Sequence, residues 1–218
     1  MSLRDKKILI GGCGLSFSRQ TSKTWVNLWR ASGANLVDVS GPAVSNDYIL
    51  NQTIFELFKN NYDIVIIQLS FLGKLDVDIS DTERHAELVL QDPVRNFTLK
   101  NIWPSSNSNH HIAKKLYNYY LQSDSIELDN INAKLLLLDR YCKNKNINLY
   151  IFLGYPINGE VSFVNTQSLT ELFAPDANGL TPNIMSQFEI AKHISKIAYP
   201  ELFKSIKLLE ESYEQHRL

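Results

Sequence analysis

Residues 11–14, which read Gly-Gly-Cys-Gly, carry the clearest chemical signal in the sequence. They follow an apolar run at 8–10 without helical period, which is typical of a buried strand that ends in a tight turn. A helix that begins after such a turn offers backbone N–H groups to an anion or to a negatively polarised oxygen. Ser16 adds a hydroxyl group, which becomes a nucleophile only where a base lies beside it.

The elements that must position these residues follow an alternating pattern of strands and helices, so we predict an α/β protein with a parallel sheet. Strands are expected at 7–11, 35–39, 63–69 and 148–153. Helices are expected at 23–31, about 46–60, 125–144, 185–197 and 200–214. In the second helix the residues predicted to face inward are Ile49, Ile54, Leu57 and Phe58.

Two segments do not fit this repeat. Residues 70–124 are interpreted as an insertion over the strand ends, a cap or lid by position. Residues 157–180 are rich in Asn, Gly and Pro and are expected to be irregular, with a weak strand at 161–164. The 218 residues suit one domain, so 1–218 is predicted to be a single domain that contains the insertion.

Composition excludes several classes of function. The formal net charge is -1, which favours neither nucleic acid nor acidic membranes as partners. Cys13 and Cys142 lie far apart, which leaves no disulfide framework and no zinc spacing. The sequence has no signal peptide or membrane span that we recognise, and a cytoplasmic location is expected. We predict no metal and no cofactor.

In element order and in four local blocks the chain resembles the SGNH, or GDSL-type, hydrolases, closest to a phage and marine-bacterial subgroup whose first block reads Gly-Cys-Ser-Phe. The resemblance implies a three-layer α/β/α sandwich with a flavodoxin-like sheet. It also implies hydrolysis of a small ester, such as an O-acyl group on a carbohydrate. In that family the nucleophile follows the first strand, oxyanion donors follow the second and third, and an Asp-x-x-His pair lies near the C-terminus.

The first block departs from the family at its central residue. In Gly12-Cys13-Gly14, the glycine Gly14 occupies the position of the nucleophile, and it has no oxygen with which to attack a carbonyl. Ser16 replaces the nucleophile if the turn directs it into the site, and otherwise caps the start of a helix. Cys13 is read as a buried structural thiol.

The second and third blocks concern the oxyanion site. Gly41 keeps the family glycine and is predicted to offer its backbone N–H to an oxyanion. The Asn expected after the third strand is absent, and Gln68 or Ser70 is left to supply a side-chain hydrogen bond.

The fourth block keeps an acid and lacks the base. Asp176 matches the family aspartate, whereas Thr181 stands before Pro182 where the catalytic His is expected. Threonine cannot accept a proton near neutral pH. Elsewhere, His110 and His111 form either a solvated helix start or a contact from the lid, and His193 suits a packing position.

Two interpretations remain open on the sequence alone. One is an esterase in which Ser16 acts as nucleophile together with Asp176. The other is an inactive relative that binds a sugar, an anionic ligand or a partner protein in the former cleft, around Gly12, Gly14 and Thr181. The third glycine of a dinucleotide-binding turn is absent, which disfavours that class of site. Oligomeric state is left open.

Overall fold

A parallel sheet organises the part of the chain that the structure describes. The computed structural model describes residues 6–16, 24–41, 44–72, 75–78, 99–102, 124–157, 159–164, 168–173 and 183–215. The strands of the sheet are β1 (Lys7–Gly11), β2 (Asn35–Asp38), β3 (Ile64–Leu69) and β6 (Asn148–Leu153). Their order is β2-β1-β3-β6, with parallel pairing throughout, as in the first four strands of a flavodoxin-like sheet. The expected α/β class is confirmed.

The register of the sheet brings the strand ends to one edge. Gly11 at the end of β1 pairs with Ile67 of β3. Leu69 at the end of β3 pairs with Leu153 at the end of β6. The turns that follow these strands therefore lie at the carboxyl edge, where ligands bind in open α/β sheets.

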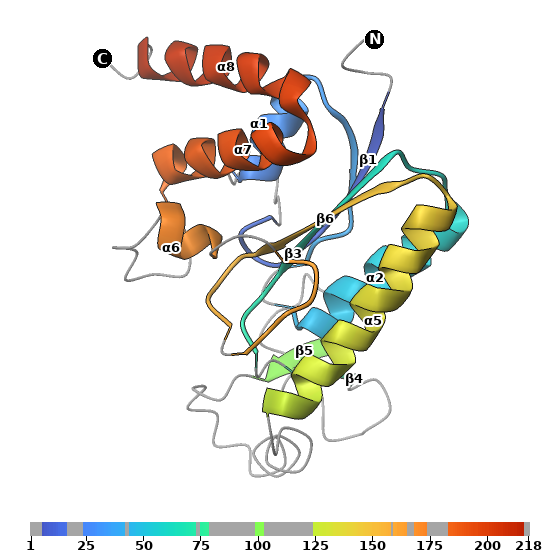
Figure 1. Cartoon of the computed structure of the whole chain (residues 1–218). Coiled ribbons are helices and arrows are strands. Elements are labelled where there is room, and N and C mark those ends of the chain that lie inside the picture. The colour runs from blue at the N-terminus through green and yellow to red at the C-terminus, as the bar shows by residue number, and fades with distance from the viewer. Residues whose placement is uncertain are drawn as a thin grey trace.

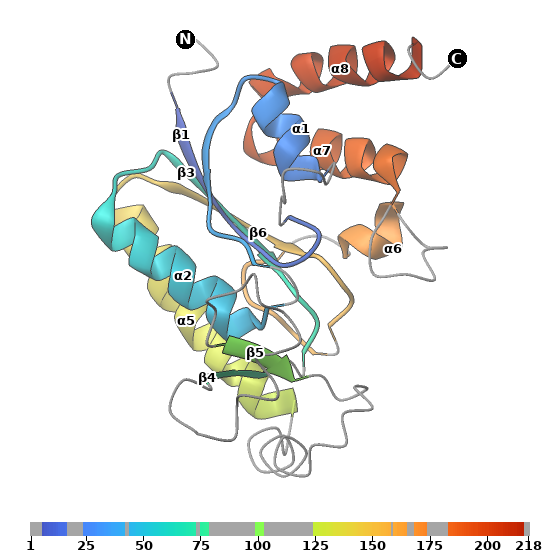
Figure 2. The ribbon, with the colours of Figure 1, turned by 180° about the vertical axis from the view of Figure 1, so that it is seen from behind.

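Helices α2 (Asn46–Lys59) and α5 (Asp124–Asn144) cover one face of the sheet (Figures 1 and 2). Ser45 caps α2, because its hydroxyl oxygen accepts a hydrogen bond from the Tyr48 N–H at 3.1 Å. The apolar cluster on this face joins strand and helix residues, among them Leu9, Val65, Ile67, Ile49, Leu50, Leu57, Ile131, Leu135 and Leu138.

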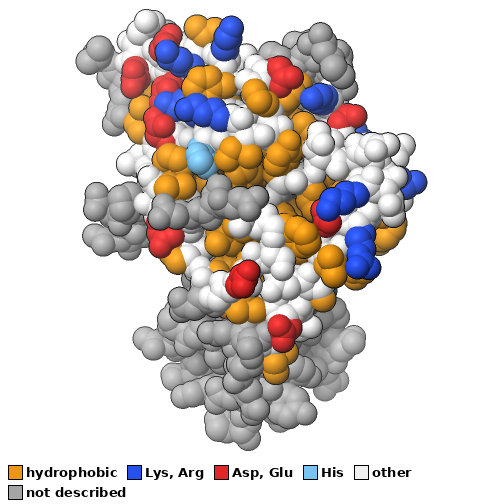
Figure 3. All heavy atoms as spheres, viewed as in Figure 1, with side chains coloured by type: hydrophobic (Ala, Val, Ile, Leu, Met, Phe, Trp, Pro, Cys, Tyr) orange, Lys and Arg blue, Asp and Glu red, His pale blue; other side chains and the backbone are white. Residues whose placement is uncertain are grey.

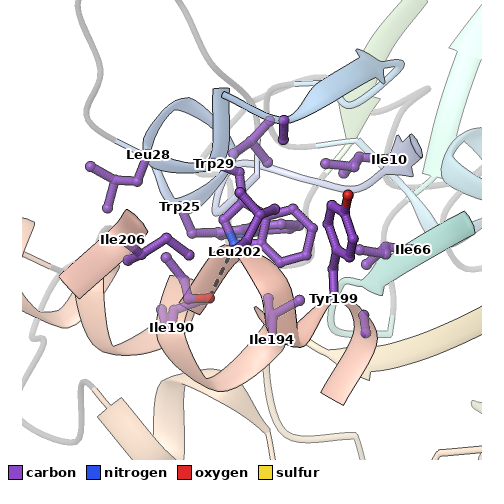
Figure 4. Packing of buried hydrophobic residues seen from close by; sticks show 14 of the residues in the cluster. Ile10, Trp25, Leu28, Trp29, Ile66, Ile190, Ile194, Tyr199, Leu202 and Ile206 are labelled. Carbon is purple, nitrogen blue, oxygen red and sulfur yellow. Dashed lines mark hydrogen bonds between the residues drawn. The ribbon is translucent and has the colours of Figure 1, made fainter. Parts of the chain in front are cut away.

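Helices α1 (Trp25–Ala31) and α7 (Ile184–Ala198) lie on the opposite face, with α8 (Phe203–Gln215) beside them (Figures 1 and 2). The ring of Trp29 meets that of Trp25 edge-on at 5.5 Å. Its indole N–H donates to the Ala191 carbonyl at 3.0 Å, which ties α1 to α7 (Figure 4). Both ring systems are fully buried, so this layer closes the three-layer sandwich.

Within the predicted insertion, β4 (Leu75–Asp78) and β5 (Leu99–Ile102) pair antiparallel as a separate small sheet. The remainder of 79–123, including His110, His111 and the helix expected around them, lies outside the described residues. The interpretation of 70–124 as a cap therefore stays a prediction. In the described part of the chain, no helix has the length and hydropathy of a bilayer span.

Three local expectations are wrong. Phe58 is 72% exposed and packs edge-on against Tyr141 at 5.3 Å, because its neighbour Leu57 takes the inward position on α2. Residues 161–164 form a turn, in which Phe163 adopts a left-handed backbone at φ 67°. A short helix, α6 (Leu169–Phe173), replaces the irregular chain expected there.

The start of α6 is marked in the sequence by a Ser and a Glu three residues apart. Ser168 and Glu171 form a capping box. The Glu171 N–H donates to the Ser168 hydroxyl oxygen at 3.3 Å, and the Ser168 N–H donates to the Glu171 carboxylate at 3.3 Å.

The last helix begins as a 3₁₀ turn, η2 (Pro200–Leu202), before α8.

Candidate functional site

The turns after β1 and β2 form one hydrogen-bonded unit at the carboxyl edge of the sheet. The Ser16 N–H donates to the Cys13 carbonyl at 2.9 Å, which closes a tight turn around Gly14. The Gly41 N–H donates to the Gly12 carbonyl at 3.1 Å. The Gly41 N–H is therefore already bonded within the protein, and its role as an oxyanion donor stays a prediction.

Ser16 lies beneath this turn and has no exposed surface. Its hydroxyl donates to the Oε1 atom of Gln68 at 2.5 Å and accepts from the Nε1–H of Trp25 at 3.1 Å. Its carbonyl accepts from the Thr24 hydroxyl at 3.3 Å. An amide oxygen and an indole do not remove protons near neutral pH, so neither of these partners activates the hydroxyl.

Gln68 is the centre of the buried polar group. Its side chain is fully buried on β3, and its amide nitrogen donates to Cys13 Sγ at 3.2 Å and to the Leu69 carbonyl at 3.1 Å. Both ends of the amide are thus bonded inside the protein. The side chain ties β3 to the first turn and points into the protein below that turn.

Glycines on two neighbouring turns make room for this buried group. A Cβ atom on Gly12 would lie 2.5 Å from Ser16 Oγ, and one on Gly154 would overlap the amide of Gln68 and lie 2.8 Å from the Leu69 carbonyl oxygen. Gly14 differs, since a Cβ there would meet no atom within 4 Å among the described residues. Among the described residues, position 14 therefore has room for a side chain.

Ser40 contributes a second polar group beside Gly12. A Cβ on Gly12 would lie 3.2 Å from Ser40 Oγ. That oxygen is shielded from solvent and has no hydrogen-bond partner among the described residues. The backbone of Ser40 is held by Asp38, whose carboxylate accepts from the Ser40 N–H at 2.9 Å. The sequence carried no separate signal for Ser40.

Asn46 holds the chain that leaves β3, a role that the sequence did not reveal beyond its place at the start of α2. Its carbonyl oxygen accepts from the Ser70 N–H at 2.7 Å, and its amide donates to the Ser70 carbonyl at 3.2 Å. Both residues are fully buried. Ser70 therefore lies at the predicted edge with its backbone fixed by a side chain from the neighbouring helix.

Tyr155 borders the same edge from the turn after β6. Its ring meets Phe71 edge-on at 5.5 Å. Burial raises the pKa of the Tyr155 hydroxyl well above its usual range. The phenol therefore stays protonated near neutral pH and acts only through hydrogen bonds and packing.

The predicted acid and base positions, Asp176 and Thr181, lie outside the described residues, so their roles stay predictions. His193 lies on α7, packs against Phe173 at 5.2 Å and makes no hydrogen bond with Ser16. Among the described residues, no group of His, Cys, Asp and Glu side chains is arranged to hold a metal ion.

The solved structures to which this chain is similar include an esterase and a lipolytic protein. The psychrotrophic esterase EstA of a Pseudoalteromonas species, inhibited by monoethylphosphonate, shares 13% identity over 97% of this chain and 100% of its own, with a TM-score of 0.47. A putative lipolytic protein of the G-D-S-L family from Desulfitobacterium hafniense shares 14% sequence identity. The match covers 88% of this chain and 99% of that protein, with a TM-score of 0.34. No family model matches the sequence, and no curated protein matches it. The fold assignment rests on the sheet order and helix layers described above.

Proposed function

We propose that this chain is a relative of the SGNH-type hydrolases that binds a small ligand at the turn 12–14 and does not use Ser16 as a nucleophile. One observation carries the proposal. The Ser16 hydroxyl is buried below the turn and donates a hydrogen bond to Gln68, whereas a Cβ on Gly14 would meet no described atom within 4 Å. The oxygen that attacks an ester in the family is thus missing from the place where a substrate would meet it.

The ligand chemistry follows from the donors at the edge. The backbone N–H groups of Cys13 and Gly14 donate to no acceptor among the described residues. The Ser40 hydroxyl lies close to Gly12 and is likewise without a described partner. Successive N–H groups in a turn favour a negatively polarised oxygen. A ligand with an acyl carbonyl oxygen, such as an acylated sugar, fits this set of donors.

Ester hydrolysis through Ser16 makes heavier demands. To attack an ester, the hydroxyl would have to break its hydrogen bonds with Gln68 and Trp25. The buried Gln68 Oε1 acceptor and the buried Trp25 Nε1–H donor would then have no partner. Each such loss costs about 1–3 kcal/mol. A base would also have to approach a side chain that has no exposed surface. The binding role requires neither change.

A fluorophosphonate probe, which labels activated serines, tests the catalytic half of the proposal. We expect no labelling of the wild type and no turnover of p-nitrophenyl acetate above that of a Ser16→Ala variant. A Gly14→Ser/Thr181→His variant is the matched positive control, because position 14 has room for a side chain. Labelling of Ser16 in the wild type would overturn the proposal.

Backbone amide NMR with N-acetylglucosamine, the amide analogue of an O-acyl sugar, tests the binding half. We expect shifts at Gly12 and Gly14 that saturate with added sugar. A Gly14→Leu variant should fold and lose these shifts, because its side chain would occupy space that no described residue fills. Equal binding by wild type and Gly14→Leu, or no shift at either glycine, would contradict the binding role.

A further inference from the structure

Large apolar side chains are exposed to solvent on the side of α2 and α5 that faces away from the sheet. Phe55 and Phe58 of α2 are 57% and 72% exposed, and Leu137 of α5 is 64% exposed. Single exposed apolar residues are ordinary on a protein surface, whereas a contiguous group of them marks a contact with another molecule. The first question is therefore whether these three side chains form one surface.

The two helices lie side by side and run in the same direction (Figures 1 and 2). Near their starts, Lys134 Nζ lies 2.8 Å from Asp47 Oδ1. Farther along, the rings of Phe58 and Tyr141 meet edge-on at 5.3 Å. Leu137 stands one helical turn from Lys134 and one from Tyr141, so its side chain lies beside α2. The exposed apolar residues of the two helices therefore belong to one surface.

On α2 the exposed residues recur at every fourth position, as Asp47, Asn51, Phe55 and Lys59. This spacing places them on one side of the helix. The stripe begins with an acid and ends with a base, about 18 Å apart along the helix. The side chain of Asp47 remains 62% exposed beside Lys134, and Lys59 Nζ lies 3.8 Å from the centre of the Phe55 ring.

The exposed stripe on α5 has the same order, with Asp129, Ala133, Leu137 and Arg140. An acid stands toward the start of the helix, apolar side chains follow, and a base stands toward the end. In Figure 3, Lys and Arg side chains gather toward the end of α5 and hydrophobic side chains lie along the helix. These two stripes, together with Phe58, form the α2–α5 surface.

We propose that the α2–α5 surface binds a second copy of this chain, with the helices of the two copies antiparallel. In a two-fold symmetric dimer one surface meets itself, so its charges must be complementary to their own arrangement. The antiparallel orientation brings Asp47 of one copy to Lys59 of the other and Asp129 to Arg140, while the apolar middles of the stripes meet. A parallel orientation would place acids on acids and bases on bases, which opposes association.

The aligned helix dipoles favour the same orientation, because the positive start of each helix then lies near the negative end of its counterpart. The surface spans only two helices, so a reversible dimer is expected and not an obligate one. This proposal is independent of the function proposed for the turn 12–14.

Sedimentation equilibrium at several protein concentrations tests the dimer. The wild type should dimerise reversibly, and Leu137→Gln should weaken dimerisation at least about tenfold, because each copy loses an apolar contact. Leu208→Gln on α8 is the matched control, because Leu208 is 67% exposed and lies on the opposite layer. It should dimerise as the wild type does. A wild type that stays monomeric up to about 1 mM, or an equal loss in both variants, would overturn the proposal.

Charge reversal tests the antiparallel orientation. Arg140→Glu and Asp129→Lys should each dimerise at least about tenfold more weakly, because like charges then meet across the two-fold axis. An equimolar mixture of the two variants should recover the dimer, since each acid again faces a base. Lys204→Glu on α8 changes the net charge as Arg140→Glu does, and it should dimerise as the wild type does. Both stripe residues are exposed, so both variants should keep the helical circular dichroism of the wild type. A mixture that does not recover the dimer would overturn the antiparallel pairing.

Discussion

The Ser16 hydroxyl donates a hydrogen bond to the Gln68 side-chain carbonyl oxygen at 2.5 Å, and the two residues are 52 positions apart in sequence. This bond joins the first turn to the central strand β3, below the edge where a ligand would lie. It makes the serine a structural tie between two strands. Four expected results test the consequences of this bond and of the buried groups around it.

Replacing Ser16 by Ala should lower the free energy of unfolding by about 2–6 kcal/mol, because Gln68 Oε1 and Trp25 Nε1 each lose a buried partner. Urea unfolding measures this change. A Ser16→Ala/Gln68→Met variant should lose less than the sum of the two single variants, since neighbouring residues couple. An unchanged midpoint in Ser16→Ala would show that the hydroxyl is not held as described.

The two glycines of the first turn should respond in opposite ways to Ala. Gly12→Ala places a Cβ 2.5 Å from Ser16 Oγ and 2.7 Å from its Cβ, so a loss of about 1–3 kcal/mol is expected. Gly14→Ala is the matched control and should leave the free energy of unfolding unchanged, because its Cβ would meet no described atom within 4 Å. Thermal unfolding of the two variants gives the comparison. A larger loss at Gly14 than at Gly12 would contradict the geometry of the turn.

Acidification should weaken the fold through His193. Burial lowers the pKa of His193, and the charge of Lys196 lowers it further, so the unfolded chain takes up this proton at a higher pH than the folded chain. The stability from the neutral ring is complete above the unfolded pKa of about 6.5 and is lost as the pH falls through the folded pKa.

A His193→Gln variant removes this contribution. Its free energy of unfolding should therefore fall less steeply than that of the wild type as the pH is lowered from about 7 to about 5. Urea unfolding in buffers free of carboxylates measures both slopes, and the other four histidines are common to both proteins. Parallel slopes would exclude His193 as the group that titrates.

The two cysteines should be unreactive in the folded protein. Cys13 is fully buried and Cys142 is 1% exposed. Burial raises the pKa of Cys142 to about 11, and negative charge at Asp139 adds to the effect, so the thiolate is scarce near neutral pH. A thiol reagent such as dithionitrobenzoate should detect no thiol in native buffer and two in denaturant. Rapid native reaction at either position would contradict the packing of these thiols.

Local pattern was sufficient to predict the main sheet. The strand at 7–11 and that at 148–153 match β1 and β6 residue for residue, and the long helix from 125 begins one residue from the start of α5. Uninterrupted apolar runs and amphipathic stripes encode these elements, because burial on a sheet face or a helix stripe constrains residue type at each position. The edge that carries the candidate site follows from the same pattern.

Tertiary structure alone decided what the residues at that edge do. The direction of the Ser16 side chain depends on Gln68 and Trp25, and the amide of Gln68 in turn needs the missing side chain of Gly154. These partners come from separate elements, so no spacing of residues along the sequence indicates that they are in contact. The contact of Asn46 with Ser70 and the place of His193 between α6, α7 and α8 likewise depend on segments that are distant in sequence. The sequence by itself determined which residue types reach the edge of the sheet. Packing between distant segments decided which of them are sealed in hydrogen bonds and which face open space.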